Sequence, residues 1–303
     1  MSSGVSWVSH KPSDRKEPYS AEEFRNIEEI FEQLIPPHTL EHLGITDLFA
    51  SSYPTWLGTT HLSSLKYLII RHCQSCEHLP AIGNLQNLKR LEIHGATAVT
   101  KIGPEFVGCG AIAFPRLEVL VIRGLTNWED WTFAVFEENA ETGRRKEVGE
   151  DVVTVKQEGE APTPRMQFLP RLKHLVLDCC PRLRALPPQL GQGTSSLKTL
   201  ELRHMHCLKV VENFMFLSES LLIAQCESLE RVSNIPNVRF LNAPLCLKLR
   251  CVETLDNLQK LIYTDDMLEM SSLWLPGLIE QRRKLQGEDL DVYTWPGCSC
   301  YTS

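Results

Sequence analysis

The dominant feature of the chain is a short pattern of apolar positions that returns along most of its length. An apolar residue is followed by a second one three positions later and a third two positions after that, with polar or variable residues between them. The last two positions alternate with variable ones, which predicts a short strand with one buried face. Nine copies of the pattern begin at Leu40, Leu65, Leu88, Leu117, Leu172, Leu197, Ser218, Val238 and Leu258.

The spacing of the copies indicates the architecture. Successive copies start 25, 23, 29, 55, 25, 21, 20 and 20 residues apart, and most of these steps lie in or near the 20–29 residues of a leucine-rich repeat. One copy cannot bury its apolar face alone, so neighbouring copies must stack around a shared core. We therefore predict an α/β fold, a curved leucine-rich-repeat solenoid with a parallel β-sheet on its concave face and irregular loops and short helices on its convex face. The 55-residue step contains either an insertion or one copy that the pattern does not reveal.

Segments outside the pattern set the predicted boundaries. Residues 1–19 are polar and are predicted to form a disordered N-terminal tail. The leucine-rich-repeat domain is predicted to span 20–280, with an acidic loop insertion at 137–161 that holds eight acidic and four basic residues and cannot support a core. Residues 281–303 are predicted to be a C-terminal cap or tail.

The domain is predicted to begin with a helix over residues 20–35. Ser20 and Glu23 have the spacing of a capping box, and prolines at 36 and 37 end the helix. The apolar residues Phe24, Ile27, Phe31 and Leu34 fall on one face of this helix.

Charge and composition narrow the functional classes. The chain has 31 basic and 38 acidic residues and a net charge of −7, which argues against a nucleic-acid binder on bulk charge. No apolar run approaches the ~18–20 residues of a membrane span, and the first residues do not have the pattern of a secretory signal. The cysteine count is odd, at eleven, and no N-glycosylation sequon occurs. We therefore expect reduced thiols and a cytoplasmic or nucleocytoplasmic location.

Cysteines and histidines are the main candidates for a chemical role. Cys73, Cys180, Cys226 and Cys246 follow the strands at the position where leucine-rich repeats place a buried Asn or Cys that bonds to neighbouring backbone, so we interpret them as structural. The Cys73-x-x-Cys76 pair with His72 and His78 resembles half a zinc site. Its first cysteine, however, is one of these four repeated structural positions, which we call ladder cysteines. Cys298-x-Cys300 has no second pair nearby. His204, His206 and Glu201 are predicted to be surface residues.

Catalytic motifs are also missing from the sequence. There is no Gly-x-Ser-x-Gly elbow, and the glycine run from Gly103 to Gly108 continues with Cys109 and Gly110. It therefore lacks the lysine and hydroxyl of a phosphate-binding loop. We predict that the chain is not an enzyme and holds no cofactor and no metal.

Four segments resemble the coiled-coil class of plant intracellular nucleotide-binding leucine-rich-repeat (NLR) disease-resistance proteins. These segments are residues 29–45, Tyr53-Pro-Thr-Trp-Leu-Gly58, Leu79-Pro-Ala-Ile-Gly-Asn-Leu85 and Phe114-Pro-Arg-Leu-Glu-Val-Leu120. The resemblance covers roughly residues 20–280, without the family's coiled coil and nucleotide-binding module. The chain thus looks like the C-terminal recognition part of such a receptor. Its first copy, at Leu40, has no obvious cap, so we expect exposed apolar surface at that end.

The resemblance implies a non-catalytic protein-recognition domain of plant innate immunity. The implied partners are proteins: a pathogen effector, a guarded host protein, or the nucleotide-binding domain of the same or a related receptor. No nucleic acid and no membrane partner is expected. An extracellular receptor-kinase ectodomain is disfavoured because the spacing is irregular and sequons are absent. Two alternatives stay open, an adaptor such as a ubiquitin-ligase substrate receptor and an unproductive truncated product.

The variable strand positions must face the concave surface, because the leucine positions face the core. Basic residues recur there although the chain is acidic overall. Either this is an ordinary solvated face or it is a positively charged surface for an acidic protein, onto which the loop 137–161 could also fold. Tyr67 and Phe240 are the best hot-spot candidates by residue type. The predicted protein-binding residues are Lys66, Tyr67, Arg71, Lys89, Arg90, Arg123, Lys173, His174, Lys198, Arg203, His204, Arg239, Phe240 and Lys260.

Overall fold

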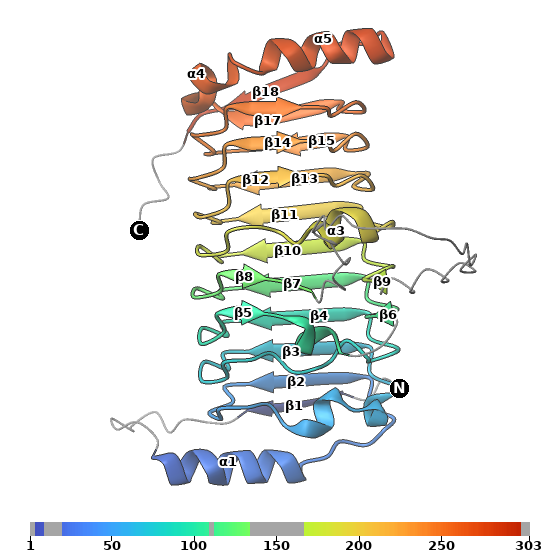
Figure 1. The fold of residues 1–303 in the computed structure, drawn as a ribbon, viewed down its shortest axis with the longest axis vertical. Helices are drawn as coiled ribbons and strands as arrows, with labels where there is room; N and C mark the ends of the chain where they lie inside the picture. Colours follow the sequence, from blue (N-terminus) through green and yellow to red (C-terminus); the bar gives the residue numbers. More distant parts are fainter. Residues whose placement is uncertain (1–3, 9–19, 109–111, 134–166, 298–303) are drawn as a thin grey trace, which may run out of the picture.

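The computed structural model describes residues 4–8, 20–108, 112–133 and 167–297. Its centre is a parallel sheet of eleven strands in the order β1-β2-β3-β4-β7-β10-β11-β13-β15-β17-β18, stacked along the long axis of the molecule (Figure 1). These strands are β1 (Gly4–Val8), β2 (His42–Thr46), β3 (Tyr67–Arg71), β4 (Arg90–His94), β7 (Val119–Arg123), β10 (His174–Asp178), β11 (Thr199–Arg203), β13 (Ser220–Ala224), β15 (Phe240–Asn242), β17 (Lys260–Thr264) and β18 (Asp291–Trp295).

Each of the nine predicted copies supplies one strand of this sheet, which confirms the solenoid. Equivalent apolar positions lie side by side, so that Leu43, Leu68 and Leu91 are successive cross-strand partners, and all three are buried. The seventh copy differs from the prediction, because Leu217 fills the core in place of the exposed Ser218 one position later. An extra residue in the turn before β13 causes this shift.

The 55-residue step contains an insertion. Strands β7 and β10 pair directly with each other, so no further strand of the sheet lies between them. On the opposite side of the core, the rings of Phe133 and Phe168 have centroids 3.9 Å apart and both are buried. These two residues flank residues 134–166 in the sequence, and their contact brings the two flanking segments together. The predicted acidic loop 137–161 lies outside the described residues.

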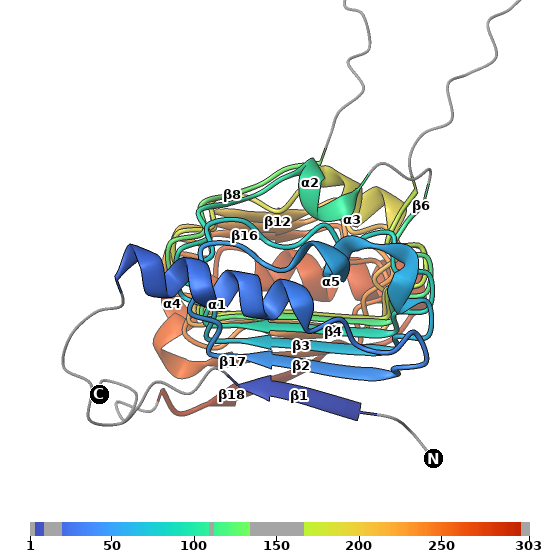
Figure 2. The same ribbon diagram turned by 90° about the horizontal axis from the view of Figure 1, so that it is seen from below.

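The convex layer is made of short elements. Viewed along the solenoid, it lies across the apolar core from the long sheet (Figure 2). It contains a three-stranded sheet, β12-β14-β16, and two strand pairs, β5-β8 and β6-β9. The convex strands and helices are β5 (Lys101–Ile102), α2 (Pro104–Val107), β6 (Ile112–Ala113), β8 (Asp130–Trp131), β9 (Gln167–Phe168), α3 (Pro188–Gly193), β12 (Val210–Glu212), β14 (Arg231–Ser233) and β16 (Cys251–Glu253), and the 3-10 turns near the N-terminal end are η1 (Thr55–Gly58) and η2 (Thr60–Leu62).

A repeated turn ends the concave strands. The residue after the strand has a left-handed backbone, with φ of 53° at His72, Cys179 and His204 and positive φ at Gly95 and Gly124. Its amide donates to a carbonyl of the next coil, meaning the next copy of the repeat along the solenoid. At His72, for example, the amide nitrogen lies 2.8 Å from the carbonyl oxygen of His94. The turn therefore fixes one exposed side chain of each coil beside the equivalent side chain of the next.

The residue after this turn is buried, and four times it is a cysteine. The thiols donate to the carbonyl of the residue two positions earlier, at 3.5 Å for Cys73, Cys180 and Cys226 and 3.7 Å for Cys246. Burial raises the pKa of Cys73 to about 11 and that of Cys180 to about 12. The prediction of structural ladder cysteines is confirmed.

Three glycines on the convex side allow adjacent coils to approach closely. A Cβ atom on Gly83 would lie 1.9 Å from the carbonyl oxygen of Val107, and one on Gly191 or Gly58 would lie 2.2 or 2.8 Å from a backbone oxygen of the next coil. Gly83 also donates to the carbonyl of Phe106 at 3.1 Å and accepts from the amide of Phe114 at 2.7 Å. Only glycine fits this contact without moving a neighbouring coil.

The N-terminal end differs from its prediction. Helix α1 (Ala21–Gln33) has the predicted capping box, with Ser20 and Glu23 bonding to each other's backbone amides. Residues 4–8, however, are not a disordered tail: they form β1, which pairs with β2. Figure 2 shows α1 lying across the end of the solenoid.

Contacts between α1, β1 and the first coils close that end. The indole of Trp7 lies edge-on to Phe31 and Trp56, with ring centroids 6.3 and 5.3 Å apart, and the Trp56 indole donates to the carbonyl of Phe31 at 3.0 Å. The prediction of an uncapped first coil is therefore wrong, because a segment before α1 adds a strand. The expected exposed apolar surface is present at this end, at Val8, Ile30 and Ile35. Of the predicted apolar helix face, Leu34 is exposed.

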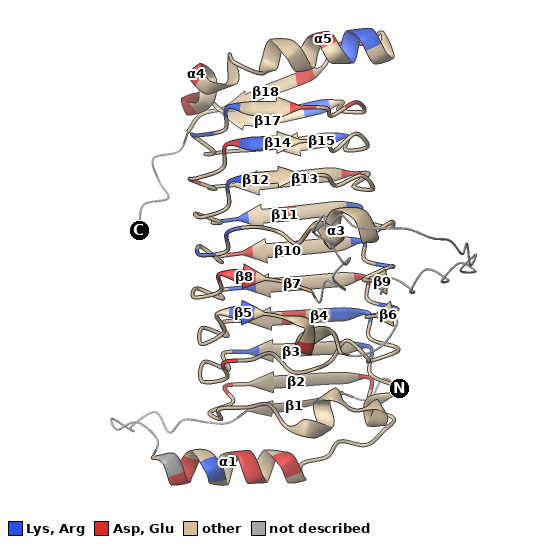
Figure 3. Cartoon of the chain, viewed as in Figure 1, with Lys and Arg blue, Asp and Glu red and all other residues tan. Residues whose placement is uncertain are grey.

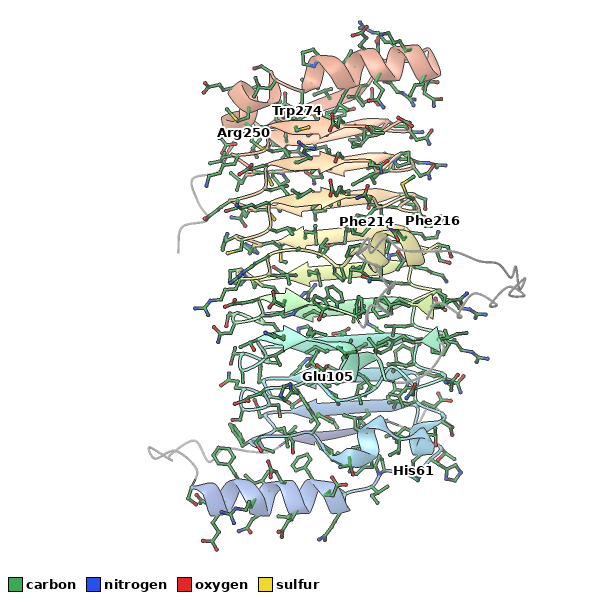
Figure 4. All side chains as sticks on the ribbon, viewed as in Figure 1. His61, Glu105, Phe214, Phe216, Arg250 and Trp274 are labelled. Carbon is green, nitrogen blue, oxygen red and sulfur yellow. The ribbon has the colours of Figure 1, made fainter. Side chains whose placement is uncertain are left out.

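The C-terminal end is closed by η3 (Asp265–Met267), α4 (Leu268–Ser271), α5 (Leu275–Gln286) and β18. The buried indole of Trp274, just before α5, donates to the carbonyl of Leu249 at 2.9 Å (Figure 4). β18 extends the sheet beyond the ninth copy. Residues 298–303, with Cys298 and Cys300, lie outside the described part of the chain. No helix among the described residues is long and apolar enough to cross a membrane.

The concave face as a candidate protein-binding surface

The concave face consists of three rows of outward side chains across the sheet and the residue that precedes each strand. One row runs through Tyr67, Arg90 and Val119, and a second runs through Ile69, Glu92 and Val121. The third runs along the strand ends through Arg71, His94 and Arg123. Because the sheet is parallel and continuous, equivalent positions of successive coils form straight lines of neighbours.

All fourteen residues predicted to bind a partner lie on this face or at its edge. The lysines at 66, 89, 173 and 198 and Arg239 precede their strands, and His204 occupies the turn after β11. The other residues point outward from the strands. The structure thus brings the predicted set together on one side of the solenoid, while its role in binding stays a prediction.

The charge of this face is smaller than the sequence suggests. It holds ten basic and seven acidic residues, and basic and acidic positions are interspersed along the chain (Figure 3). Seven of the ten basic residues have a carboxylate within 4.0 Å: Lys66–Glu41, Arg71–Glu92, Arg90–Glu92, Arg123–Asp178, Lys173–Glu118, Lys198–Glu219 and Arg203–Glu201. No described carboxylate lies within 4.0 Å of Lys89, Arg239 or Lys260.

Glu92 is the centre of the densest of these ion-pair groups. Its carboxylate lies 2.6 Å from Nε of Arg90, 3.0 Å from Nε2 of His94 and 4.0 Å from Nη2 of Arg71. Burial raises the pKa of Glu92, but the hydrogen bonds from Arg90 and His94 outweigh it and hold the pKa below its ordinary value. Glu92 therefore stays ionised and neutralises the cationic side chains around it.

An alignment of the copies would have predicted these ion pairs from the sequence. Aligning the copies places Glu41 beside Lys66 and Glu118 beside Lys173, and the structure finds these atoms 2.6 and 2.7 Å apart. The bond from Lys173 lowers the pKa of Glu118. Exposed pairs of this kind contribute little to stability, yet they remove much of the positive field that a count of lysines predicts.

Exposed aromatic residues gather at the C-terminal end of the face. We define the aromatic patch as Phe240, Lys260, Tyr293 and Trp295, which lie on the neighbouring strands β15, β17 and β18. Phe240 is 43 % exposed and Trp295 is 63 % exposed, and Nζ of Lys260 lies 4.5 Å from the ring centroid of Tyr293. Tyr293 and Trp295 are not among the residues predicted to bind, although Leu290 and Val292 carry a period-2 signal for β18.

Tyr67, the other predicted hot spot, is less available. Its ring stacks on that of His42 of the preceding coil, with centroids 4.3 Å apart and an interplanar angle of 7°, and it is half-buried. The patch is therefore the stronger candidate for an anchor.

The Cys73-x-x-Cys76 pair is a core feature. Both cysteines are fully buried, and the Cys76 thiol donates to the carbonyl of Ala50 at 3.2 Å. Burial raises the pKa of both thiols, and among the described residues Cys73 and Cys76 belong to no group of three potential metal ligands. The interpretation of Cys73 as a ladder residue holds.

Comparison with known proteins agrees with this architecture. A family model described as R13L1/DRL21 LRRs matches residues 6–96. The chain is 32 % identical over 114 residues to the putative disease resistance RPP13-like protein 1 of Arabidopsis thaliana and 32 % identical over 99 residues to the putative disease resistance protein RGA1 of Solanum bulbocastanum. The chain is a leucine-rich-repeat region, and part of it is similar in sequence to plant proteins named as disease resistance proteins.

This leucine-rich-repeat region matches only a small part of its relatives. The two alignments cover 35 % and 33 % of the chain but 11 % and 10 % of the relatives. A solved structure, the leucine-rich repeat domain of the type III effector XopL, aligns with a TM-score of 0.50 over 85 % of this chain and 69 % of its own. At 18 % identity that likeness shows the fold. Leucine-rich-repeat domains are typically non-catalytic modules for protein interaction.

Proposed function

We propose that the chain is a non-catalytic protein-recognition domain of plant innate immunity and that it contacts its partner through the concave face. The observation that carries the proposal is the aromatic patch at the end of this face. Exposed tyrosine and tryptophan side chains, such as Tyr293 and Trp295, are among the residue types that dominate binding energy at protein interfaces. They lie on a continuous sheet whose strands hold them in fixed positions.

The composition of the face supports a protein rather than a polyanion as the partner. Its middle row includes Ile69, Val121, Val176, Leu222 and Ile262. Glu92 and Glu201 interrupt this row, and the charged residues on either side of it are largely paired, so that the face offers apolar contacts among neutralised charges, as protein interfaces do. A nucleic-acid site would need many unpaired cations to neutralise phosphates, and the face offers three.

The proposed partner is a protein of plant defence, and the proposed location is the cytoplasm. Candidates are a pathogen effector, a host protein that an effector modifies, or the nucleotide-binding domain of the same or a related receptor. The relatives are disease-resistance proteins by name, and the chain corresponds to a small part of them. A contact with a nucleotide-binding domain would let the face hold a receptor inactive until an effector competes.

Site-specific photocrosslinking tests this proposal in plant tissue. A benzophenone amino acid replaces Phe240 in one version of the chain and Phe216 in another. The two phenylalanines are matched, with exposed fractions of 43 % and 42 %, but Phe216 lies off the concave face in the turn between β12 and β13 (Figure 4).

We expect covalent adducts with a defence-related protein from position 240 that are missing from position 216, and we expect the Tyr293→Ala substitution to reduce their yield. Equal adducts from both positions, or adducts from position 216 only, would place the binding surface elsewhere. Adducts from position 240 that consist of nucleic acid would overturn the assignment of a protein partner.

A further inference from the structure

Asp178, Cys179 and His204 form a cluster at the edge of the concave face. Asp178 is the last residue of β10, Cys179 is the turn residue that follows it, and His204 is the turn residue after β11. Nδ1 of His204 lies 2.9 Å from Oδ1 of Asp178 and 3.7 Å from Sγ of Cys179. All three potential ligand atoms lie within 4.8 Å of one another.

Two of these distances are close to those around a tetrahedral metal ion. With Zn–S near 2.3 Å and Zn–N and Zn–O near 2.1 Å, tetrahedral ligands lie about 3.6 Å apart for sulfur and nitrogen and about 3.4 Å apart for nitrogen and oxygen. The observed sulfur–nitrogen distance of 3.7 Å needs almost no change. The nitrogen–oxygen distance of 2.9 Å must open by a few tenths of an ångström, which a rotation of the half-exposed imidazole can supply.

The backbone holds two of the three ligands in position before any ion arrives. Cys179 and His204 occupy equivalent left-handed turns, both with φ of 53°. Their amides donate to the carbonyls of Arg203 and Ala224 at 3.1 and 3.0 Å. These hydrogen bonds between neighbouring turns set the spacing of the two side chains. Binding an ion therefore requires no rearrangement of the main chain.

The same turns earlier in the solenoid provide a comparison. Nδ1 of His72 lies 3.4 Å from Oδ1 of Asp47, on two equivalent turns, but no cysteine completes that pair. The cluster at β10 and β11 differs by the thiol of Cys179, which is exposed. Among the described residues, it is the one group of three or more such side chains with this proximity.

We propose that Asp178, Cys179 and His204 form a transition-metal site on this chain, with Zn²⁺ as the best-suited ion. Sulfur, imidazole and carboxylate ligands together favour Zn²⁺ over the oxygen-seeking Ca²⁺ and Mg²⁺. The thiol releases its proton when it coordinates the ion, and the imidazole carries its own proton on Nε2. Three protein ligands leave the fourth position open, as in catalytic and bridging zinc sites.

The surroundings of the site set its expected strength. Nε of Arg123 lies 3.9 Å from Oδ2 of Asp178, so it faces the carboxylate oxygen that the ion does not use, and it lowers the affinity by repulsion. The open position lies on the edge of the proposed recognition face. The proposal of a metal site does not depend on that proposed function, because metal binding is measured on the chain alone.

Cobalt titration of the full chain in a reducing buffer tests the site, because Co²⁺ bound to a thiolate gives a charge-transfer absorption that Zn²⁺ abolishes on replacing it. The titration uses a Cys298→Ser/Cys300→Ser background, which removes the terminal cysteine pair. We expect one equivalent of Co²⁺ to bind. Cys179→Ser should abolish the band, and His204→Gln and Asp178→Asn should each weaken binding at least tenfold.

Matched controls separate the site from general thiol binding. Cys207 is also exposed, and His206 lies two residues from His204, so Cys207→Ser and His206→Gln should leave the titration unchanged. Circular dichroism checks that each variant is folded. Zn²⁺ should also raise the unfolding temperature of the parent chain but not that of the Cys179→Ser variant. A missing band, or a band of the same intensity in Cys179→Ser, would overturn the proposal.

Discussion

Replacing Gly83 by alanine is the sharpest test of the coil stacking. The new Cβ atom would lie 1.9 Å from the carbonyl oxygen of Val107, and real Cβ contacts below 3.0 Å are essentially never seen. The two coils must therefore move apart by about 1.1 Å. The obstacle is backbone, so no flexible side chain can yield instead.

The expected cost follows from what that movement disrupts. Overpacking a well-packed site costs about 1–3 kcal/mol. The bonds of Gly83 to Phe106 and Phe114 each contribute about 1 kcal/mol when intact. The lower entropy of alanine in the unfolded chain returns about 0.4–1 kcal/mol. We expect Gly83→Ala to lower the free energy of unfolding by about 2–4 kcal/mol.

Urea denaturation followed by tryptophan fluorescence measures the effect, and Gly277→Ala is the matched control. Gly277 lies in α5, and a Cβ atom there would meet nothing within 4 Å. Because alanine favours a helix over glycine by up to about 1 kcal/mol, this control should be neutral or slightly stabilising. Gly58→Ala, with a 2.8 Å contact, should fall between the two.

Hydrogen exchange locates the damage. In Gly83→Ala, the amides of residues 83 and 114 should lose protection, while those of β17 should not, because a solenoid transmits strain mainly to neighbouring coils. Equal denaturation midpoints for the Gly83 and Gly277 variants would refute the reasoning. It would mean that the coils have more freedom to separate than the structure indicates.

Three further predictions concern cysteines, acid stability and the helix cap. In the native chain at pH 8, iodoacetamide should modify the exposed Cys207, whereas the buried Cys180, with a pKa of about 12, should react only after unfolding; mass spectrometry of the peptides distinguishes the two, and equal rates would contradict the buried ladder. Burial raises the pKa of Glu92 and hydrogen bonds lower it, with a net lowering. The contribution of Glu92 to stability is therefore present above the unfolded pKa and is lost as the pH falls through the folded pKa. Glu92→Gln should flatten the acid dependence of the urea midpoint, and an unchanged dependence would show that Glu92 is not responsible. Ser20→Ala removes the capping box and should cost α1 about 1 kcal/mol, seen as faster exchange of its amides while those of β17 stay unchanged.

The concave sheet could be predicted from the sequence because its signal repeats. Each copy is weak alone, but Leu65, Leu68 and Ile70 have equivalents in eight other copies, and all nine strands are found. A shift of one residue, as at Leu217, could not be predicted, because a turn of different length preserves the packing of the core but changes the spacing in the sequence. The convex strands could not be predicted either, because elements of two or three residues, such as β8, have no detectable period in the sequence.

The end strands and the site were harder to predict, for a different reason. β1 and β18 do not repeat the full pattern, and their burial comes from α1, Trp56 and the neighbouring strands. The ion pairs and the Asp178–Cys179–His204 cluster depend on neighbours across coils rather than along the chain. Along the sequence His204 is two residues from His206, whereas in space it lies beside Cys179, 25 residues earlier.

The contact between Phe133 and Phe168 has a consequence for how this protein can change over evolution. Because these rings hold the two ends of the insertion together, the coils on either side are already joined whatever lies between them. Doubling the length of such a segment adds only about 0.6 kcal/mol of loop-closure entropy. Changes in chain length between Phe133 and Phe168 should therefore cost little stability, while the strands of the concave face keep their register.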